Sequence, residues 1–84
     1  MQGQPDTLLL TIASVGETRF DGPARSVTLP GSVGEFTILP HHEPIVTTLK
    51  RGTVRVLDAS GETRQFQIES GVLECSANRV IVLL

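Results

Sequence analysis

The chain has 84 residues, a hydrophobic fraction of 39% and a formal net charge of −2, which fits one small domain and excludes a disordered tail. It has no basic field for nucleic acid or an anionic membrane surface, and three phenylalanines without Trp or Tyr disfavour a platform that stacks bases or sugars. The one cysteine cannot form an internal disulfide, and neither a signal peptide nor an apolar run of about 18 residues is present. We therefore expect a soluble cytoplasmic protein that binds no nucleic acid and does not insert into a membrane.

Apolar side chains recur with a period of two in the first part of the chain. After a polar start at residues 1–6, which we expect to fray, this alternation covers residues 7–13, 17–21 and 24–29. It predicts three short strands, the second of which ends at Asp21-Gly22-Pro23. The side chains that we expect to point into a common core are Leu8, Leu10, Ile12, Phe20, Val27 and Leu29.

The segment 31–47, which reads GSVGEFTILPHHEPIVT, contains the most unusual residues of the chain. A strand with Phe36 and Ile38 on one face is predicted to end at Pro40, and a second strand begins at Pro44 with a β-branched run. Both histidines of the protein lie in the loop between these strands. The loop is therefore the first candidate for a functional site.

The second half of the chain continues the pattern of short strands and tight turns. Strands are predicted at residues 53–57, 63–69, 72–75 and 79–84, with Gly61 at a position of positive φ in the first hairpin. The whole chain then has about nine or ten strands and no helical periodicity. This pattern predicts an antiparallel β-sandwich or barrel.

The last predicted strand is apolar on both faces, since residues 80–84 read VIVLL. A strand that is covered on one side only is expected to alternate apolar and polar side chains. Two interpretations follow: both faces are buried within the domain, or one face contacts a partner.

His41, His42 and Glu43 suggest a metal site, but adjacent residues of an extended segment point to opposite sides. Only His41 and Glu43 could converge, so we interpret this tripeptide as an exposed polar loop. No nucleophile motif or phosphate-binding loop is present, and Cys75 lies on the apolar side of its strand, which predicts a core position. The carboxylates that we interpret as solvated rather than catalytic include Glu17, Asp58, Glu62 and Glu69. We expect no enzymatic activity, no metal and no cofactor.

The residues VTLPGSVGEFTILPHHEPIVTTLKRGTVRV resemble the strand–loop–strand core of the epsilon subunit of F-type ATP synthases. The family pattern has a Gly-Ser-acid-Gly-Glu turn, a strand that ends at Pro, then Gly-His-x-Pro, two aliphatic residues, Thr and a Lys-x-Gly turn. The flanking segments FDGPARSVTLPG and ESGVLECSANRVIVLL are also similar to those of the family. The resemblance covers roughly residues 8–84.

The resemblance implies a ten-stranded antiparallel β-sandwich, with residues 1–84 as one domain of the epsilon type. It implies a non-catalytic rotor subunit of the central stalk, which joins the gamma subunit to the ring of c subunits and supports the coupling of proton flow to ATP synthesis. Such a subunit lies peripherally at the cytoplasmic face of the inner membrane. The residues implied at the gamma interface are Ser14, His41, His42, Pro44 and Thr47. Those implied at the c ring are Gly34 and Glu35.

The sequence departs from the family pattern at several positions. Val33 replaces an acidic residue, His41 replaces the usual Gly, and Glu43 replaces a small residue, which makes the loop bulkier and more charged. The chain also ends at Leu84, before the family's C-terminal helical hairpin, either as a naturally short form or as a truncation. Without that hairpin we expect no binding of ATP and no inhibition of ATP hydrolysis. The alternative is an unrelated small β-sandwich that serves as a binding module or a metal-dependent enzyme.

Overall fold

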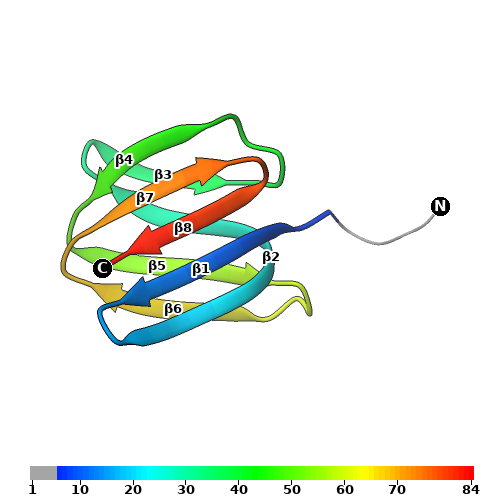
Figure 1. Cartoon of the computed structure of the whole chain (residues 1–84), viewed down its shortest axis with the longest axis horizontal. Coiled ribbons are helices and arrows are strands. Elements are labelled where there is room, and N and C mark those ends of the chain that lie inside the picture. The colour runs from blue at the N-terminus through cyan, green and yellow to red at the C-terminus, as the bar shows by residue number, and fades with distance from the viewer. Residues whose placement is uncertain (1–5) are drawn as a thin grey trace.

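The computed structural model describes residues 6–84, which form eight β-strands and no helix (Figure 1). The strands are β1 (Leu8–Ser14), β2 (Glu17–Gly31), β3 (Gly34–Ile38), β4 (Ile45–Leu49), β5 (Gly52–Asp58), β6 (Thr63–Ile68), β7 (Gly71–Ser76) and β8 (Arg79–Leu83). Residues 6–84 contain no helix that is long and apolar enough to cross a membrane. Apart from Asp6, the segment that was predicted to fray lies outside the described residues.

The strands pack as two layers around a common core. β1, β8, β7 and β4 follow one another in the first layer, which faces the viewer in Figure 1. The second layer contains β3, β2, β5 and β6. β2 connects the two layers, because its first half pairs with β1 and its second half pairs with β3 and β5. The predicted all-β sandwich class is therefore confirmed.

Every strand contributes apolar side chains to the core between the layers. Burial follows the predicted period of two, as in β1, where Leu8, Leu10 and Ile12 are buried and Leu9 is exposed. Cys75 is 2% exposed, in agreement with its predicted core position, and burial raises the pKa of its thiol. The other buried apolar side chains are Ala24, Val27, Leu29, Ile38, Leu49, Val54, Val56, Ile68, Leu73, Val80 and Val82.

The number of strands is lower than the ten that were expected, because residues 17–21 and 24–29 belong to one continuous strand, β2. Pro23 was predicted to end the first of these segments, but it pairs with Leu9 of β1 inside the strand. Proline lacks an N–H group and is tolerated where a strand is paired on one side only. β2 meets this condition here, since its pairing with β5 begins at Ala24.

One pair of strands is parallel, which the antiparallel expectation missed. β1 and β8 run in the same direction, with partners from Leu9 and Arg79 to Ala13 and Leu83. Both strands belong to hairpins, so the parallel contact joins the first hairpin of the chain to the last. Such a contact depends on segments far apart in the chain, and local alternation carries no information about it.

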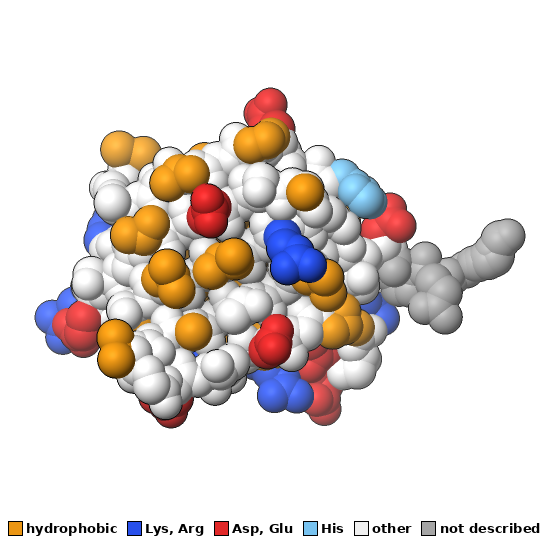
Figure 2. All heavy atoms as spheres, in the orientation of Figure 1, with side chains coloured by type: hydrophobic (Ala, Val, Ile, Leu, Met, Phe, Trp, Pro, Cys, Tyr) orange, Lys and Arg blue, Asp and Glu red, His pale blue; other side chains and the backbone are white. Residues whose placement is uncertain are grey.

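The outer side of the first layer exposes apolar side chains. In β8, Val80 and Val82 point into the core, whereas Ile81 is half-buried and Leu83 is 58% exposed. The interpretation that both faces of this strand are buried within the domain is therefore wrong, and contact with a partner stays a prediction. We define the outer apolar face, which Figure 2 shows from the front, as Leu9, Val46, Val72, Ile81 and Leu83.

Candidate functional site

A groove lies between β3 and β4, where the edges of the two layers approach each other. β4 reaches the second layer through a single pair, Gly31 with Leu49, so the rest of this edge stays open. The opening has a volume of about 380 Å³. We define the β3–β4 groove by its lining residues, which are Gly31, Ser32, Val33, Gly34, Glu35, Phe36, Thr37, His42, Ile45 and Thr47.

The structure brings together residues that the resemblance assigned to two different partners. Gly34 and Glu35, expected at the c ring, line the same groove as His42 and Thr47, expected at the gamma subunit. Gly34 has a φ of 146°, and a Cβ atom at this position would meet no heavy atom within 4 Å. The turn between β2 and β3 therefore needs glycine for its backbone conformation and not for space.

The other residues expected at the gamma interface lie outside the groove. His41 and Pro44 are exposed in the loop between β3 and β4. Ser14 is at the end of β1 and lines a separate hollow of about 280 Å³ together with Ile68 and Leu84. These residues and the groove therefore do not form one continuous site.

Glu35 already has a partner within the chain. Its Oε2 atom is 3.0 Å from Nη2 of Arg55 in β5, and the two side chains are 55% and 42% exposed. An ion pair at such an exposed position contributes little to folding, typically about 0–1 kcal/mol. A cation of a binding partner would have to compete with Arg55 for the same carboxylate.

The loop between β3 and β4 contains a tight turn at Pro40 and His41. The N–H of His42 donates to the carbonyl of Leu39 at 3.2 Å, and His41 has a φ of 66°. Pro followed by a residue of positive φ is typical of a type II turn, in which the second position favours Gly. His41 therefore occupies a position where a side chain costs about 1–2 kcal/mol.

The histidines of this loop contact different groups. Nε2 of His41 is 3.8 Å from Oδ2 of Asp6, and Nδ1 of His42 is 2.6 Å from the carbonyl oxygen of Glu43. In residues 6–84, no three side chains of His, Cys, Asp or Glu are grouped so that they could hold a metal ion. The prediction of an exposed polar loop is confirmed for His41 and Glu43, which are both exposed, and His41 contacts Asp6.

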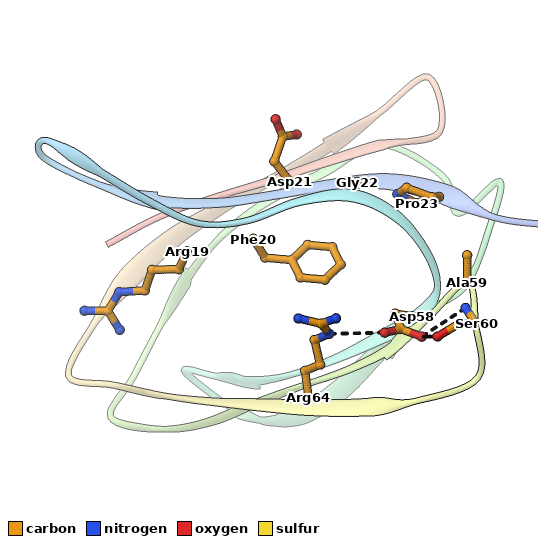
Figure 3. Close-up of a pocket in the computed structure, with 9 residues that line it drawn as sticks. All are labelled: Arg19, Phe20, Asp21, Gly22, Pro23, Asp58, Ala59, Ser60 and Arg64. Carbon is orange, nitrogen blue, oxygen red and sulfur yellow. Dashed lines mark hydrogen bonds and ion pairs between the residues drawn. The ribbon is translucent and has the colours of Figure 1, made fainter.

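A third hollow lies at another edge of the sandwich, between the first half of β2 and the hairpin that joins β5 to β6 (Figure 3). Its volume is about 420 Å³. We define this Asp58 pocket by its lining residues, which are Arg19, Phe20, Asp21, Gly22, Pro23, Asp58, Ala59, Ser60 and Arg64. The Phe20 ring points into it, and Arg19 extends away from it.

Asp58 was expected to be solvated, and this prediction is wrong, since the residue is 7% exposed. Its carboxylate accepts hydrogen bonds from the hydroxyl and N–H of Ser60 at 2.6 and 3.0 Å and from the N–H of Glu62 at 2.9 Å. Nε of Arg64 donates at 3.1 Å. These bonds, led by that of the Ser60 hydroxyl, lower the pKa of Asp58 to about 2. An Asp two residues before Ser, at the start of a hairpin loop, is the sequence signal of such a turn.

Arg64 also contacts the aromatic side chains of this edge. Its guanidinium carbon lies 5.9 Å from the centroid of the Phe20 ring, which packs edge-on against Phe66 at 6.3 Å. Both interactions add to the stability of a folded chain. The polar groups of the Asp58 pocket are therefore used within the protein, and we assign it a structural role.

The comparison with known families and proteins agrees with this arrangement. Residues 7–84 match the family described as the ATP synthase delta/epsilon chain β-sandwich domain. The ATP synthase epsilon chain of Bordetella petrii is 39% identical over 77 residues, which are 92% of this chain and 55% of that protein. The epsilon chain of Delftia acidovorans is 40% identical over 78 residues, which are 93% and 56% of the two. The chain thus spans a little over half the length of these curated relatives.

Solved structures of low sequence identity show the same fold. A chain in the mitochondrial ATP synthase of Euglena gracilis, solved with OSCP, F1 and c-ring, matches with a TM-score of 0.87 at 24% identity, over 98% of this chain and 52% of that one. A chain in the central stalk and c-ring of the Tetrahymena thermophila mitochondrial enzyme matches with a TM-score of 0.77 at 14% identity, over 96% and 65%. From the family match and the curated relatives together, the chain belongs to the family of ATP synthase delta/epsilon chain β-sandwich domains.

Proposed function

We propose that the chain is a non-catalytic rotor subunit of a proton-translocating ATP synthase, in which it joins the gamma subunit to the c ring. In this function it belongs to a membrane-bound complex and lies on the cytoplasmic side of the membrane. It supports the coupling of proton flow to ATP synthesis. Membership in the family removes the alternative of an unrelated sandwich.

The observation that supports this proposal most is the β3–β4 groove itself. It places Gly34 and Glu35 beside His42 and Thr47, so that one edge of the sandwich offers residues for both expected partners. A subunit that links two others needs two contact surfaces on one rigid body. The strands that carry these residues are fixed by pairing with β2 and β7.

The proposed gamma surface combines apolar area with a stiff loop. The outer apolar face includes Val46 of β4. Thr47, the next residue, points to the opposite side of this strand and lines the β3–β4 groove. An exposed apolar face of neighbouring side chains is typical of a site where another protein binds. Pro40 and Pro44 restrict the loop that carries the histidines, which lowers the entropy lost on binding.

The proposed contact with the c ring is polar. Glu35 is at the start of β3, and its carboxylate is more than half exposed beside Arg55. A carboxylate on a rigid turn can form a charge-assisted hydrogen bond with a basic residue of another subunit. Such a bond would replace the exposed ion pair with Arg55.

The test is the affinity of the chain for its cognate gamma subunit. Thr47→Arg places a charged side chain in the β3–β4 groove and should raise the dissociation constant at least about tenfold if this groove is central to binding. Thr63→Arg is the matched control, because Thr63 is an exposed strand threonine on the edge strand β6, away from the groove. Isothermal titration calorimetry on variants with an unchanged far-UV spectrum measures both. Equal affinities for the two variants would show that gamma does not use the groove.

A further inference from the structure

The turn between β7 and β8 contains two residues with left-handed backbone conformations. Ala77 has a φ of 51° and Asn78 has a φ of 62°. A two-residue hairpin loop of this kind is a type I′ turn, for which Asn is among the preferred residues. The backbone alone would accept Gly at position 78 equally well, so it does not account for the side chain of Asn78.

The side chain of Asn78 connects two other segments. Its Oδ1 atom accepts a hydrogen bond from the N–H of His41 at 2.8 Å, and its Nδ2 group donates to the carbonyl of Thr7 at 2.9 Å. The carbonyl of Asn78 also accepts a hydrogen bond from the N–H of Leu9 at 3.1 Å. One residue therefore holds together the start of β1, the β7–β8 hairpin and the loop between β3 and β4, which meet at one end of the sandwich (Figure 1).

The loop at residues 39–44 makes few other hydrogen bonds or ion pairs with the rest of the described chain. Within residues 39–44, the remaining hydrogen bonds join neighbours, from His42 to Leu39 and to Glu43. The contact of His41 with Asp6 spans 3.8 Å between side chains that are 67% and 79% exposed, and such a contact is weak. The bond from Asn78 fixes the residue of the turn whose backbone is least favourable for a side chain.

We propose that Asn78 is a positioning residue for partner binding, which holds the 39–44 loop in one conformation and so presents His42 at the β3–β4 groove. This inference rests on the proposed function, in which that loop contacts the gamma subunit. Binding would then be weakened when the loop is released, although Asn78 need not touch the partner. The amide suits this role because it has a donor and an acceptor for two backbone groups at once.

Three variants separate this role from that of a turn residue. Asn78→Gly keeps the left-handed turn and removes both side-chain hydrogen bonds. Asn78→Asp keeps the acceptor for the N–H of His41 and replaces the donor to Thr7 by an oxygen, which repels that carbonyl. Ala77→Gly is the matched control, since it changes the neighbouring left-handed residue, whose exposed side chain has no hydrogen-bonding group.

Two measurements are made on each variant. Hydrogen exchange of the His41 amide, followed by NMR on the free chain, reports whether the loop is held. Calorimetric titration with the gamma subunit reports binding. We expect Asn78→Gly to accelerate exchange of the His41 amide and to weaken binding, each by about three- to tenfold, as for the loss of a single hydrogen bond. Exchange of the His41 amide should be accelerated less in Asn78→Asp than in Asn78→Gly. Both exchange and binding should change by less than about twofold in Ala77→Gly.

The outcomes distinguish this inference from the proposed function. If the unmodified chain does not bind gamma, the proposed function fails. Faster exchange of the His41 amide in Asn78→Gly would then still establish that Asn78 holds the loop. Unchanged exchange of the His41 amide in Asn78→Gly would overturn the inference. It would also be overturned if the loop were released and gamma still bound with undiminished affinity, or if Ala77→Gly had the same effects as Asn78→Gly.

Discussion

The Asp58 pocket and the β3–β4 groove both lie where the two layers of the sandwich meet at an edge, and they use their polar groups in different ways. In the pocket, Asp58 accepts hydrogen bonds from Ser60 and Arg64, which are lining residues themselves. In the groove, the polar side chains bond to groups that do not line it, such as Glu35 to Arg55 and His42 to the carbonyl of Glu43.

This difference shows which hollow is available to a partner. In the Asp58 pocket, the Asp58, Ser60 and Arg64 side chains bond one another, so a ligand at Asp58 would have to displace bonds that stabilise the chain. The β3–β4 groove presents the Phe36 and Ile45 side chains between small residues. The larger of the two hollows is thus the structural one, and volume alone would have selected the wrong site.

The largest expected effect comes from adding a side chain at Gly31, which lines the β3–β4 groove. A Cβ atom at Gly31 would lie 2.7 Å from Cε1 of Phe36 and 2.8 Å from the carbonyl oxygen of Gly34. Gly31→Ala should therefore lower the free energy of unfolding by about 1–3 kcal/mol, as overpacking does, and should weaken binding of gamma by displacing Phe36. Urea denaturation measures the first effect and calorimetry the second.

Gly22→Ala is the control for this change. Gly22 lines the Asp58 pocket, its backbone is not in the left-handed region, and a Cβ atom there would meet no heavy atom within 4 Å. Alanine at such a position commonly stabilises by about 0.4–1 kcal/mol. A loss of stability at Gly22 as large as that at Gly31 would contradict the difference in packing between the two edges.

The second effect is a dependence of stability on pH that originates in the Asp58 pocket. The pKa of Asp58 is lowered to about 2 in the folded chain, against about 3.9 in an unfolded one. Its ionised form therefore contributes stability above about pH 4, and this contribution is lost as the pH falls through about 2. Asp58→Asn should lower the melting temperature at pH 7 by about 5 °C, and the difference from the unmodified chain should shrink between pH 4 and pH 2.

Thermal unfolding by circular dichroism at a series of pH values checks this expectation. Glu62→Gln is the matched control, because Glu62 is an exposed carboxylate in the same loop. It should change the melting temperature little at any pH. A constant difference between Asp58→Asn and the unmodified chain down to pH 2 would show that the carboxylate acts by packing and not by its charge.

The smallest effect concerns the ion pair at the rim of the groove. Glu35→Gln should change the free energy of unfolding by less than about 1 kcal/mol and should weaken attachment to the c ring more at low salt than at high salt. Arg55→Gln frees the carboxylate of Glu35 from its partner at 3.0 Å and should leave attachment unchanged or strengthen it. Binding to purified c ring at two salt concentrations measures both variants, and equal losses at the two concentrations would indicate shape and not charge.

The fold could be predicted from the sequence wherever it depends on local alternation. The buried side chains of β1, such as Leu10 and Ile12, follow from a period of two. The continuity of β2 through Pro23 could not, because it depends on which edge of the strand is paired. The parallel pairing of β1 with β8 could not be predicted either, because the two strands lie at opposite ends of the chain.

Prediction of the candidate site from the sequence has the same limit, because its geometry depends on segments that are distant in the chain. The resemblance selected Glu35 and Thr47, but their meeting in one groove follows from the position of β3 and β4 at adjoining edges. Asp58 pairs with Arg64 of β6 in addition to its bonds within the hairpin loop, and the role of Asn78 depends on a loop 37 residues away in the chain. Asn is common in turns, and the residue type alone does not reveal a contact over that distance, whereas the turn at Asp58 has a local sequence signal.

The central claim is that a partner binds at the β3–β4 groove and not at the Asp58 pocket. Hydrogen–deuterium exchange of the unmodified chain, measured by mass spectrometry with and without the gamma subunit, compares both edges in one experiment. We predict that peptides covering residues 31–49 gain protection in the complex, whereas those covering residues 57–66 exchange as in the free chain. Protection of residues 57–66 without any change in residues 31–49 would contradict the account.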